Sequence, residues 1–420
     1  MDIGWKLRRL GHLVRRLKGS IAIRGWHGTL RRAMRDRGVD DSDVNADVAL
    51  RAPAEGKRHR RILVVETMTP DPTRDSGSMR LCHIFELLNA DGWYIDFIAD
   101  DDDAMPRDIA RLAALGVEVH RGNPAPWMRE HGMALDAVML CRLPVADQYV
   151  ALTRRLAPKA RIIFDTVDLH YVREDRAAAL TSNAALARQA IRSRKRELDM
   201  VARADVTLVV SGKEREILAR EAPQSRVELV SNIHRVAGRS QPFASRSGLL
   251  FVGGFGHPPN EDAVRWFAAE VLPLVRERDT SIVFHVVGDI DESTRHAIAQ
   301  PGMIVHGRVN DLAPVLAQTR VSVAPLRFGA GVKGKVNQAM SHGLPVVLTT
   351  LAAEGMYLQD DIDALIADQA GAMADAIDRV YHDEALWMRL SDGGLENVRS
   401  HFSTERARET LRRALNEPSA

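Results

Sequence analysis

Short apolar runs alternate with amphipathic stretches along most of the chain. Runs such as ILVV, IIF and VTLVV are followed by segments in which apolar residues recur at helical spacing. Buried strands that alternate with helices are typical of a parallel sheet covered on both faces. In the first half of the chain the expected strands are residues 60–68, 94–103, 117–122, 136–143, 160–170, 204–211 and 226–232, and the expected helices are residues 80–93, 107–116, 148–158, 184–203 and 213–222.

The same alternation restarts at residue 248. Two Rossmann-like, doubly wound parallel-sheet domains of the α/β class are therefore predicted, at residues 58–240 and 241–420, joined near residues 233–247. The final helix is expected to return toward the N-terminal domain. Ligands of such sheets bind beyond the carboxyl ends of the strands, so two facing domains define one central cleft. The second set of expected strands is 248–255, 281–289, 303–309, 321–327, 344–350 and 364–368, with helices at 260–278, 311–319, 336–343 and 407–416.

Residues 1–57, ahead of these domains, have a different pattern. Leucines at positions 7, 10, 13 and 17 recur among arginines, and residues 1–39 contain 11 lysines and arginines against two aspartates. This pattern predicts a basic amphipathic helix, followed by a polar linker at residues 40–57. Two interpretations stay open: residues 1–37 contact an anionic membrane surface, or the helix packs on the main body with a solvated basic face. Nucleic acid is not an expected partner, because the rest of the chain is acidic and no aromatic platform accompanies the arginines.

Composition refines this picture only slightly. The 420 residues are 45% hydrophobic and 27% charged, which suits packed cores. Cys82 and Cys141 lie in apolar contexts that favour buried thiols over a disulfide. Because no run of about 18 apolar residues and no secretory signal is present, we expect a cytoplasmic protein, either soluble or peripheral on the inner face of the plasma membrane.

The stretch RFGAGVKGK at residues 327–335 carries the first candidate chemistry. Its glycines let the backbone approach a ligand, the amino end of the following helix favours negative charge, and Lys333 and Lys335 add two positive charges. A diphosphate fits these features better than a single carboxylate. The spacing matches neither a P-loop nor a dinucleotide-binding G-x-G-x-x-G. In the alternative interpretation the glycines only turn the chain and the lysines are solvated.

In the first domain, DSGSMR at residues 75–80 follows a strand and opens a helix. Gly77 would let backbone N–H groups reach phosphate oxygens, and Arg80 would add charge. A helix cap by Ser76 or Ser78, with nothing bound, is the alternative.

A second stretch, DTVDLHYVRE, brings Asp168, His170 and Arg173 to the end of the fifth expected strand. A histidine beside carboxylates at the carboxyl end of a strand favours a functional role. Arg142 also ends a strand, and either a ligand contact or a structural ion pair explains it. The four acids at residues 100–103 are most simply a solvated loop, and no metal site is expected.

Several of these stretches, in this order, resemble glycosyltransferase family 4. The segments FVGGFGHPPNEDAVRWF, VVGD and HGRVNDLAPVLAQTRVSVAPLRFGAGVKGKVNQAMSHGLPVVLTTLAAEGM are similar to its donor-binding half, and RILVVETMTPDPTRDSGSMR, DLHYVRE, ADVTLVVSGKERE and LVSNIH to its acceptor-binding half. The resemblance covers about residues 61–402. It implies a GT-B fold, a nucleoside-diphosphate sugar as donor substrate, retention at the anomeric carbon, and no obligatory metal or other cofactor.

The resemblance also implies roles for individual residues. Lys333 and Lys335 would stabilise the departing diphosphate, and His170 would lie beside the reacting sugar and the acceptor hydroxyl. These three are the expected catalytic residues. The expected donor-binding residues are Gly77, Arg80, Gly254, Gly331, Gln338 and Glu354, and the expected acceptor-binding residues are Asp168, His170, Arg142 and Arg173.

One departure from the family pattern concerns two glutamates. Many members carry Glu-x7-Glu in this region, whereas this chain has Ala330 and Gln338 at those positions. Gln338 can still hydrogen-bond a ribose hydroxyl, and Glu354 in AAEGM is an available substitute for the contact to the donor sugar. The combination of GAGVKGK and EGM resembles a set of bacterial cell-surface polysaccharide transferases.

The predicted function is therefore transfer of a sugar to a hydroxyl of a glycan or lipid-linked glycan in bacterial cell-surface polysaccharide biosynthesis. Two alternatives remain. A GT-B sugar-nucleotide epimerase would share the fold and the phosphate site, but it should need additional acids and bases around the sugar. A non-catalytic scaffold of a glycan-assembly complex would bind the nucleotide sugar without consuming it.

Overall fold

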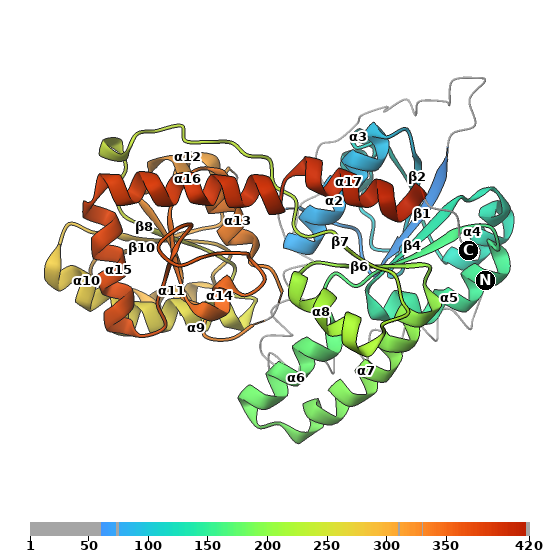
Figure 1. The fold of residues 1–420 in the computed structure, drawn as a ribbon, viewed down its shortest axis with the longest axis horizontal. Coiled ribbons are helices and arrows are strands. Elements are labelled where there is room, and N and C mark those ends of the chain that lie inside the picture. The colour runs from blue at the N-terminus through green and yellow to red at the C-terminus, as the bar shows by residue number, and fades with distance from the viewer. Residues whose placement is uncertain (1–59, 73–74, 310, 330, 417–420) are drawn as a thin grey trace.

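The computed structural model describes residues 60–72, 75–309, 311–329 and 331–416. The basic segment and linker predicted at residues 1–57 lie outside these residues. Two lobes lie side by side, each built on a twisted sheet with helices on both faces (Figure 1). This is the predicted pair of Rossmann-like domains.

The N-terminal domain contains, among the described residues, a seven-stranded parallel sheet in the order β3-β2-β1-β4-β5-β6-β7. Separate apolar clusters cover its two faces. The strands are β1 (Arg61–Glu66), β2 (Tyr94–Ala99), β3 (Val117–His120), β4 (Ala137–Cys141), β5 (Arg161–Asp165), β6 (Val206–Val209) and β7 (Val227–Leu229). The helices are α2 (Ser76–Ala90), α3 (Pro106–Ala114), α4 (Pro124–His131), the 3-10 turn η1 (Gly132–Ala134), α5 (Arg142–Leu156), α6 (His170–Thr181), α7 (Ala184–Arg203) and α8 (Gly212–Glu221).

The C-terminal domain has a six-stranded parallel sheet in the described residues, in the order β10-β9-β8-β11-β12-β13, around one continuous core. Its strands are β8 (Leu249–Val252), β9 (Phe284–Val287), β10 (Met303–Gly307), β11 (Val321–Ala324), β12 (Val346–Leu348) and β13 (Leu365–Ile366). Its helical segments are η2 (Phe243–Ser245), α9 (Pro258–Trp266), η3 (Phe267–Val271), α10 (Leu272–Arg278), α11 (Glu292–Ile298), α12 (Ala313–Gln318), α13 (Gly334–Ser341), α14 (Thr350–Ala353), α15 (Ala370–His382) and α16 (Glu384–His401).

The sequence expectation missed helices α4, α6, α11, α14, α15 and α16, and of these α6 carries residues of the predicted site. The fifth strand ends at Asp165 rather than continuing to His170, and His170 is the first residue of α6. The buried carboxylate of Glu197, on α7, accepts hydrogen bonds from the backbone N–H groups of His170 and Tyr171, both at 3.2 Å. This contact from a distant residue satisfies the amino end of α6, and the local sequence does not reveal it.

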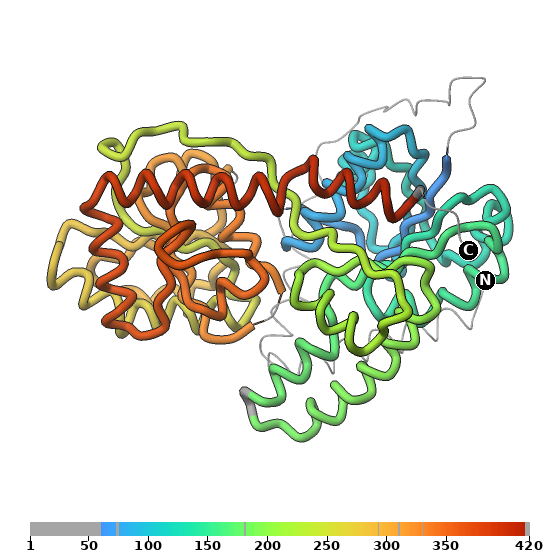
Figure 2. Tube along the Cα trace, in the orientation of Figure 1, coloured from blue at the N-terminus to red at the C-terminus, as the bar shows by residue number. Residues whose placement is uncertain are grey.

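The chain crosses between the lobes twice, and the two crossings lie side by side (Figure 2). The backbone N–H of His234 donates to the carbonyl of Phe402 at 2.8 Å, and His234 also pairs with Ser403 as an isolated bridge. After the second crossing, α17 (Thr404–Asn416) lies on the N-terminal domain, where Arg408 and Arg412 form ion pairs with Asp91. The final helix thus ties the end of the chain to the first lobe.

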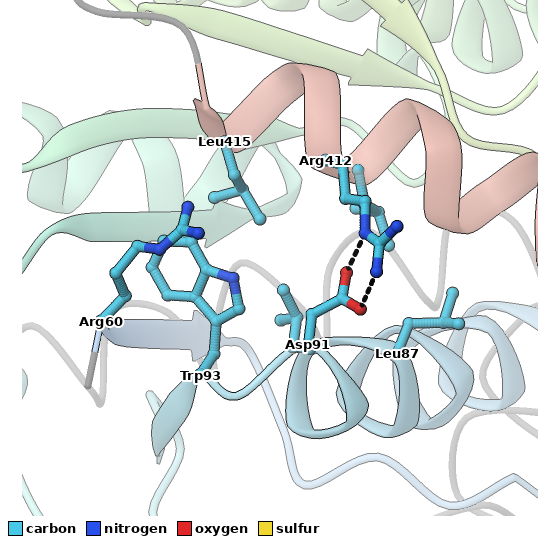
Figure 3. A pocket seen from close by; sticks show the side chains of 8 residues that line it. Arg60, Leu87, Asp91, Trp93, Arg412 and Leu415 are labelled. Atoms are coloured by element: carbon cyan, nitrogen blue, oxygen red, sulfur yellow. Dashed lines mark hydrogen bonds and ion pairs between the residues drawn. The ribbon is translucent and has the colours of Figure 1, made fainter. Parts of the chain in front are cut away.

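A pocket of about 320 Å³ lies beneath α17 (Figure 3). Apolar side chains, a tryptophan and the ion pair between Asp91 and Arg412 line it. It is formed by α17, α2 and the start of the first sheet, so it is separate from the carboxyl ends of the strands.

No helix in the part of the chain that the structure describes is long and apolar enough to cross a membrane.

Candidate functional site

The amino ends of two helices, one from each domain, meet at the cleft. An added Cβ on Gly334, at the start of α13, would lie 2.5 Å from the hydroxyl oxygen of Ser76, at the start of α2. The same Cβ would lie 3.5 Å from the side-chain nitrogen of Asn232, which has no hydrogen-bond partner among the described residues. The positive ends of both helix dipoles make this meeting point favourable for an anion.

Lys333 precedes α13 and is 7% exposed. Its ammonium donates to the carbonyl of Gly331 at 2.5 Å, and its backbone N–H donates to the sulfur of Met356 at 3.3 Å. Burial lowers the pKa of Lys333 to about 8, although the carboxylate of Glu354 acts in the opposite direction. Gly331 has a φ of 71°, a backbone conformation that favours glycine.

Lys335 lies one residue into α13 and is partly buried. Its ammonium donates to the side-chain oxygen of Asn260 at 2.5 Å and lies 4.2 Å from the ring centre of Phe251. Burial, together with repulsion from Lys333, lowers the pKa of Lys335 to about 7. Among the described residues no carboxylate forms an ion pair with either lysine, so the pair is suited to a ligand that brings negative charge.

Two glycines follow β8, and the structure shows which one needs to be glycine. Asn260, which holds Lys335, donates to the carbonyl of Gly254 at 2.9 Å. An added Cβ on Gly253 would lie 2.8 Å from the Lys335 ammonium, whereas one on Gly254 would meet nothing closer than 3.8 Å. Gly253 thus lies against Lys335, and the predicted donor-binding residue Gly254 is its neighbour.

Glu354 forms an ion pair across the cleft with Arg176 of α6. The two terminal guanidinium nitrogens of Arg176 donate to the two carboxylate oxygens of Glu354, at 2.8 and 2.7 Å. Each side chain is about one third exposed. Sequence reasoning missed Arg176, because α6 was not predicted and nothing local marks this arginine.

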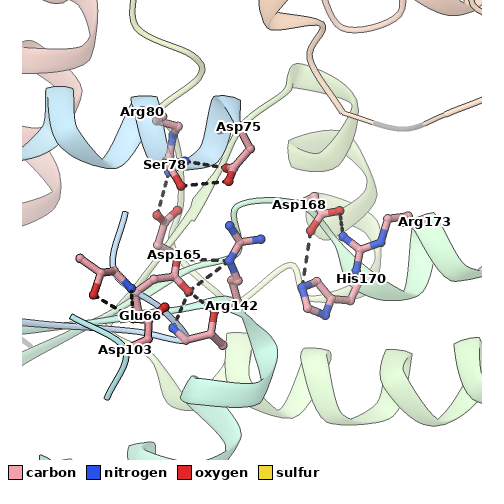
Figure 4. A network of polar contacts seen from close by, with 12 residues as sticks. Glu66, Asp75, Ser78, Arg80, Asp103, Arg142, Asp165, Asp168, His170 and Arg173 are labelled. Atoms are coloured by element: carbon pink, nitrogen blue, oxygen red, sulfur yellow. Dashed lines mark hydrogen bonds and ion pairs between the residues drawn. The ribbon is translucent and has the colours of Figure 1, made fainter. Parts of the chain in front are cut away.

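Arg142 lies at the centre of a polar network in the N-terminal domain (Figure 4). Its guanidinium donates to both oxygens of Glu66, at 3.1 and 3.2 Å. Burial by itself would lower the pKa of Arg142, but the carboxylates of Glu66, Asp168 and Asp75 outweigh it and raise the pKa. The ion pair that the sequence offered as one explanation for Arg142 is therefore present.

Gly77 lies against this network at the start of α2. An added Cβ there would lie 3.0 Å from Val167 and 3.1 Å from the guanidinium of Arg142. Val167 and Arg142 both have positive φ, 61° and 69°, which is uncommon for residues with a side chain and gathers at functional sites. Gly77 therefore lets two strained residues approach the helix end.

Asp168, His170 and Arg173 form the next group along the cleft (Figure 4). Arg173 pairs with one carboxylate oxygen of Asp168, and the other lies 3.5 Å from Nε2 of His170. Burial, reinforced by the charge of Arg173, lowers the pKa of His170 to about 3, so its imidazole is neutral at physiological pH. Burial alone would raise the pKa of Asp168, but Arg173, His170 and Arg142 outweigh it and lower the pKa. The three residues lie together as the sequence predicted.

Arg80 requires a correction. Its side chain is 1% exposed and lies inside the N-terminal domain, where it donates to Asp165 at 2.7 Å and to the carbonyl of Val230 at 2.8 Å. A buried arginine committed to these two acceptors joins α2 to the sheet, and the geometry argues against a donor-binding role. Asp75, rather than Ser76 or Ser78, caps α2 by accepting from the N–H of Ser78 at 2.8 Å.

Gln338 lies on α13 and is partly buried, and its backbone carbonyl accepts from the hydroxyl of Ser341 at 2.8 Å. Ala330, the other position at which the chain departs from the glutamate pattern, lies outside the described residues.

The acids at residues 100–103 hold local structure. Asp103 accepts from both the backbone N–H and the hydroxyl of Thr69 at 2.9 Å, and Asp100 accepts from Gln148 at 3.1 Å. A different group in the described residues, Asp96, Glu118 and His120, is close enough to share a cation. Arg61 already donates to both oxygens of Asp96, at 2.6 and 2.9 Å, so these residues do not fit a metal well.

Comparison with known proteins identifies the domain that carries the two lysines. Residues 246–383 match the family model described as Glycosyl transferases group 1. The matched residues are about a third of the chain. Lys333, Lys335, Asn260 and Glu354 lie within them. A relative from Oryza sativa subsp. japonica, named probable sucrose-phosphate synthase 2, is 24% identical over 149 residues, which are 35% of this chain and 16% of the rice protein. The chain thus matches less than a fifth of that relative's length.

Solved structures resemble the two-domain arrangement as a whole, beyond the residues matched by the family model. Sucrose-phosphate synthase from Thermosynechococcus elongatus superposes with a TM-score of 0.62 at 15% identity, over 84% of this chain and 98% of that one. Anabaena HepE in complex with UDP and glucose superposes with a TM-score of 0.61 at 11% identity, over 86% of this chain and 100% of that one. At these identities the likeness shows the fold, which is the predicted GT-B arrangement.

Proposed function

We propose that this protein is a retaining glycosyltransferase of family 4. It moves a sugar from a nucleoside diphosphate to a hydroxyl of a glycan or lipid-linked glycan in bacterial cell-surface polysaccharide biosynthesis. The observation that carries the proposal is the pair Lys333 and Lys335, which lies at the amino end of α13 without a carboxylate partner in the described residues. Gly334, between them, meets the start of α2 across the cleft. The group 1 domain match supports it.

Departure of the diphosphate is the step that these residues would assist. Negative charge develops on the diphosphate as the bond to the sugar breaks, and fixed donors in a site shielded from water stabilise it. A bound diphosphate would also raise the pKa of Lys333 and Lys335, so that both are protonated when the leaving group needs them. On this proposal the chain requires no metal for the step, because the lysines and two helix ends supply the positive charge.

The acceptor would lie on the other side of the cleft, beside His170. A neutral imidazole has one nitrogen that accepts and one that donates a hydrogen bond, so it can orient a hydroxyl without adding charge. Asp168 and Arg173 hold each other beside this imidazole. Retention lets an oxygen of the departing phosphate take the acceptor proton, and on this proposal His170 orients the acceptor.

Uridine is the base we propose to test first, since a structural neighbour, HepE, was solved with UDP and glucose. Thermal melting of the full chain would be followed with UDP, GDP, dTDP and CMP and their sugars, for the wild type, Lys333→Ala/Lys335→Ala and the control Lys195→Ala. Lys195 is an exposed lysine on α7. At 100 times its dissociation constant a ligand should stabilise the fold by about 2.7 kcal/mol.

Stabilisation by one nucleotide in the wild type and the control, lost in the double variant, is the expected result. Failure of every nucleotide to stabilise the wild type would contradict the proposal. If a sugar nucleotide binds but no diphosphate is released in the presence of any acceptor tested, the result would favour the scaffold. Conversion of the donor sugar without an acceptor would favour the epimerase.

Localisation on the inner face of the plasma membrane is part of the proposal and has its own test. The basic segment at residues 1–57 would bring the protein to lipid-linked acceptor through anionic lipids. Deleting residues 1–57 should therefore release the protein from sedimenting membranes. Unchanged sedimentation would remove this part of the proposal and leave the transfer reaction untouched.

A further inference from the structure

The turn that follows α14 contacts the anion loop and the opposite domain at once. Glu354 reaches α6 through its ion pair with Arg176. Two residues later, the buried sulfur of Met356 accepts the backbone N–H of Lys333. The next residue, Tyr357, contacts the N-terminal domain again, since an added Cβ on Gly212 would lie 2.9 Å from its hydroxyl oxygen. Residues 354–357 therefore connect Lys333 to the other lobe.

Glu354 is also the carboxylate that acts most strongly on Lys333. Of the charges that influence the pKa of Lys333, Glu354 is the largest, and it acts to favour the protonated form. Even so, the two side chains form no ion pair, because both oxygens of Glu354 are occupied by Arg176 and the ammonium of Lys333 donates to Gly331. Without Arg176, the carboxylate of Glu354 would be left with Lys333 as a cation on which its charge already acts.

We propose that Arg176 is a positioning residue of the donor site: it holds Glu354 across the cleft and thereby leaves Lys333 available to bind the diphosphate. This inference rests on the proposed function. It adds a contribution from the N-terminal domain to donor binding, made through Glu354 rather than by contact with the nucleotide.

The geometry explains why an arginine serves here. A guanidinium occupies both oxygens of a carboxylate in a planar fork, whereas a lysine ammonium occupies them as a single point charge. Helix α6 is itself held at its amino end by Glu197, so the position of Arg176 is set by the same helix that presents His170. One short helix thus carries a residue for each side of the cleft.

A double-mutant cycle on the full chain tests the proposal. UDP affinity would be measured by titration calorimetry, with GDP and dTDP in turn if UDP does not bind, for the wild type, Arg176→Ala, Glu354→Gln and Arg176→Ala/Glu354→Gln. Arg176→Ala should weaken binding about fivefold, because a partly exposed charge pair is worth up to about 1 kcal/mol. In the Glu354→Gln background, the same change should have no effect, since no carboxylate remains to neutralise Lys333.

Two further variants complete the design. Arg176→Lys should bind UDP more tightly than Arg176→Ala, although less tightly than the wild type. Arg192 is an exposed arginine on the neighbouring helix α7, and the control variant Arg192→Ala should bind as the wild type does. Equal weakening by Arg176→Ala in both backgrounds would overturn the proposal, because Arg176 would then act on the nucleotide directly or through the fold. Unchanged binding by Arg176→Ala would overturn it as well. Absence of binding to the wild type would overturn the proposed function and this inference together.

Discussion

Gly334 and Ser76 touch across the cleft, although they begin helices in different domains. The backbone φ of Gly334 is not in the left-handed region, so its conformation does not require glycine. The requirement is one of space, because an added Cβ would lie 2.5 Å from the hydroxyl oxygen of Ser76. The approach of these two helix ends therefore depends on the absence of one methyl group.

Gly334→Ala should lower the rate of sugar transfer without lowering the stability of the fold. Alanine is the better residue for a helix by up to about 1 kcal/mol, so the C-terminal domain should melt at the same or a higher temperature. Sugar transfer should fall, because the two helix ends can no longer approach each other. Calorimetric melting and a transfer assay would be measured on the same preparation. Full activity in this variant would show that transfer does not need the two helix ends to approach this closely. Gly371→Ala is the matched control, because an added Cβ on Gly371 meets nothing within 4 Å.

Nucleoside-diphosphate binding should take up protons. In the free protein the pKa of Lys333 is about 8 and that of Lys335 about 7, and a bound anion would raise both. Near pH 7.5 binding should therefore take up about one proton, and affinity should fall as the pH rises from 7 to 9. Calorimetric titration in buffers of different ionisation enthalpy measures this uptake. It should shrink in Lys335→Arg, since arginine stays protonated, and uptake equal to that of the wild type would show that Lys335 is not the titrating group.

The same two lysines should affect stability in the absence of ligand. Their pKa values lie below the ordinary 10.5, so between about pH 7 and 10.5 the unfolded chain binds more protons than the folded one. The free energy of unfolding should therefore gain a contribution as the pH rises through this window. Urea unfolding of the wild type and Lys333→Met/Lys335→Met at pH 7 and 9 measures the difference. An equal pH dependence in both proteins would contradict the low pKa values.

Arg80→Ala should impair the fold rather than the binding of nucleotide. The substitution leaves the carboxylate of Asp165 buried without its partner, and breaking a buried pair costs about 3–5 kcal/mol of unfolding free energy. Replacing both charges, in Arg80→Met/Asp165→Asn, should cost less. Urea unfolding measures the loss of stability in both variants. UDP titration, at a temperature where Arg80→Ala is folded, measures the effect on nucleotide binding. A loss of affinity without a loss of stability would restore the donor-binding role that the sequence predicted.

His170→Gln should reduce transfer while leaving UDP affinity unchanged, because His170 lies on the acceptor side.

The pKa of His170 is lowered to about 3, so its neutral form contributes stability above the ordinary value of 6.5, and this contribution is lost as the pH falls toward 3. The difference in unfolding free energy between wild type and variant should therefore change below pH 6.5, as followed by urea unfolding at pH 7, 6 and 5. A transfer rate that titrates near pH 6.5 in the wild type and not in the variant would contradict a neutral, buried His170.

Much of the fold followed from the pattern of the sequence. Apolar strand cores recur between amphipathic segments, and such a pattern is compatible with few architectures other than a parallel sheet with helices on both faces. The joint between the domains is predicted at residues 233–247, because the alternation restarts at residue 248 after this polar stretch. Helix α6 was not predicted, because the hydrogen bonds at its amino end come from Glu197, which lies 27 residues away from His170 in the chain.

For the candidate site, the sequence indicated which residues to consider, and the structure showed which of them lie inside the fold. Lys333, Lys335, Gly77 and His170 were predicted from the sequence because each stands in a local pattern of glycines, charges or a strand end that has a physical meaning by itself. Arg80 was misassigned from the same kind of pattern, because its position at a helix start does not reveal that its guanidinium turns inward to Asp165.

By itself the sequence determined the two-domain architecture and the loop that places positive charge at a helix end, since both depend on residues close together in the chain. Tertiary structure alone decided which groups face one another across the cleft. The contacts of Gly334 with Ser76 and of Arg176 with Glu354 join residues more than 170 positions apart, and their geometry depends on how two separately folded sheets are held together. Local patterns carry no information about that packing, so these contacts could be seen only in the folded chain.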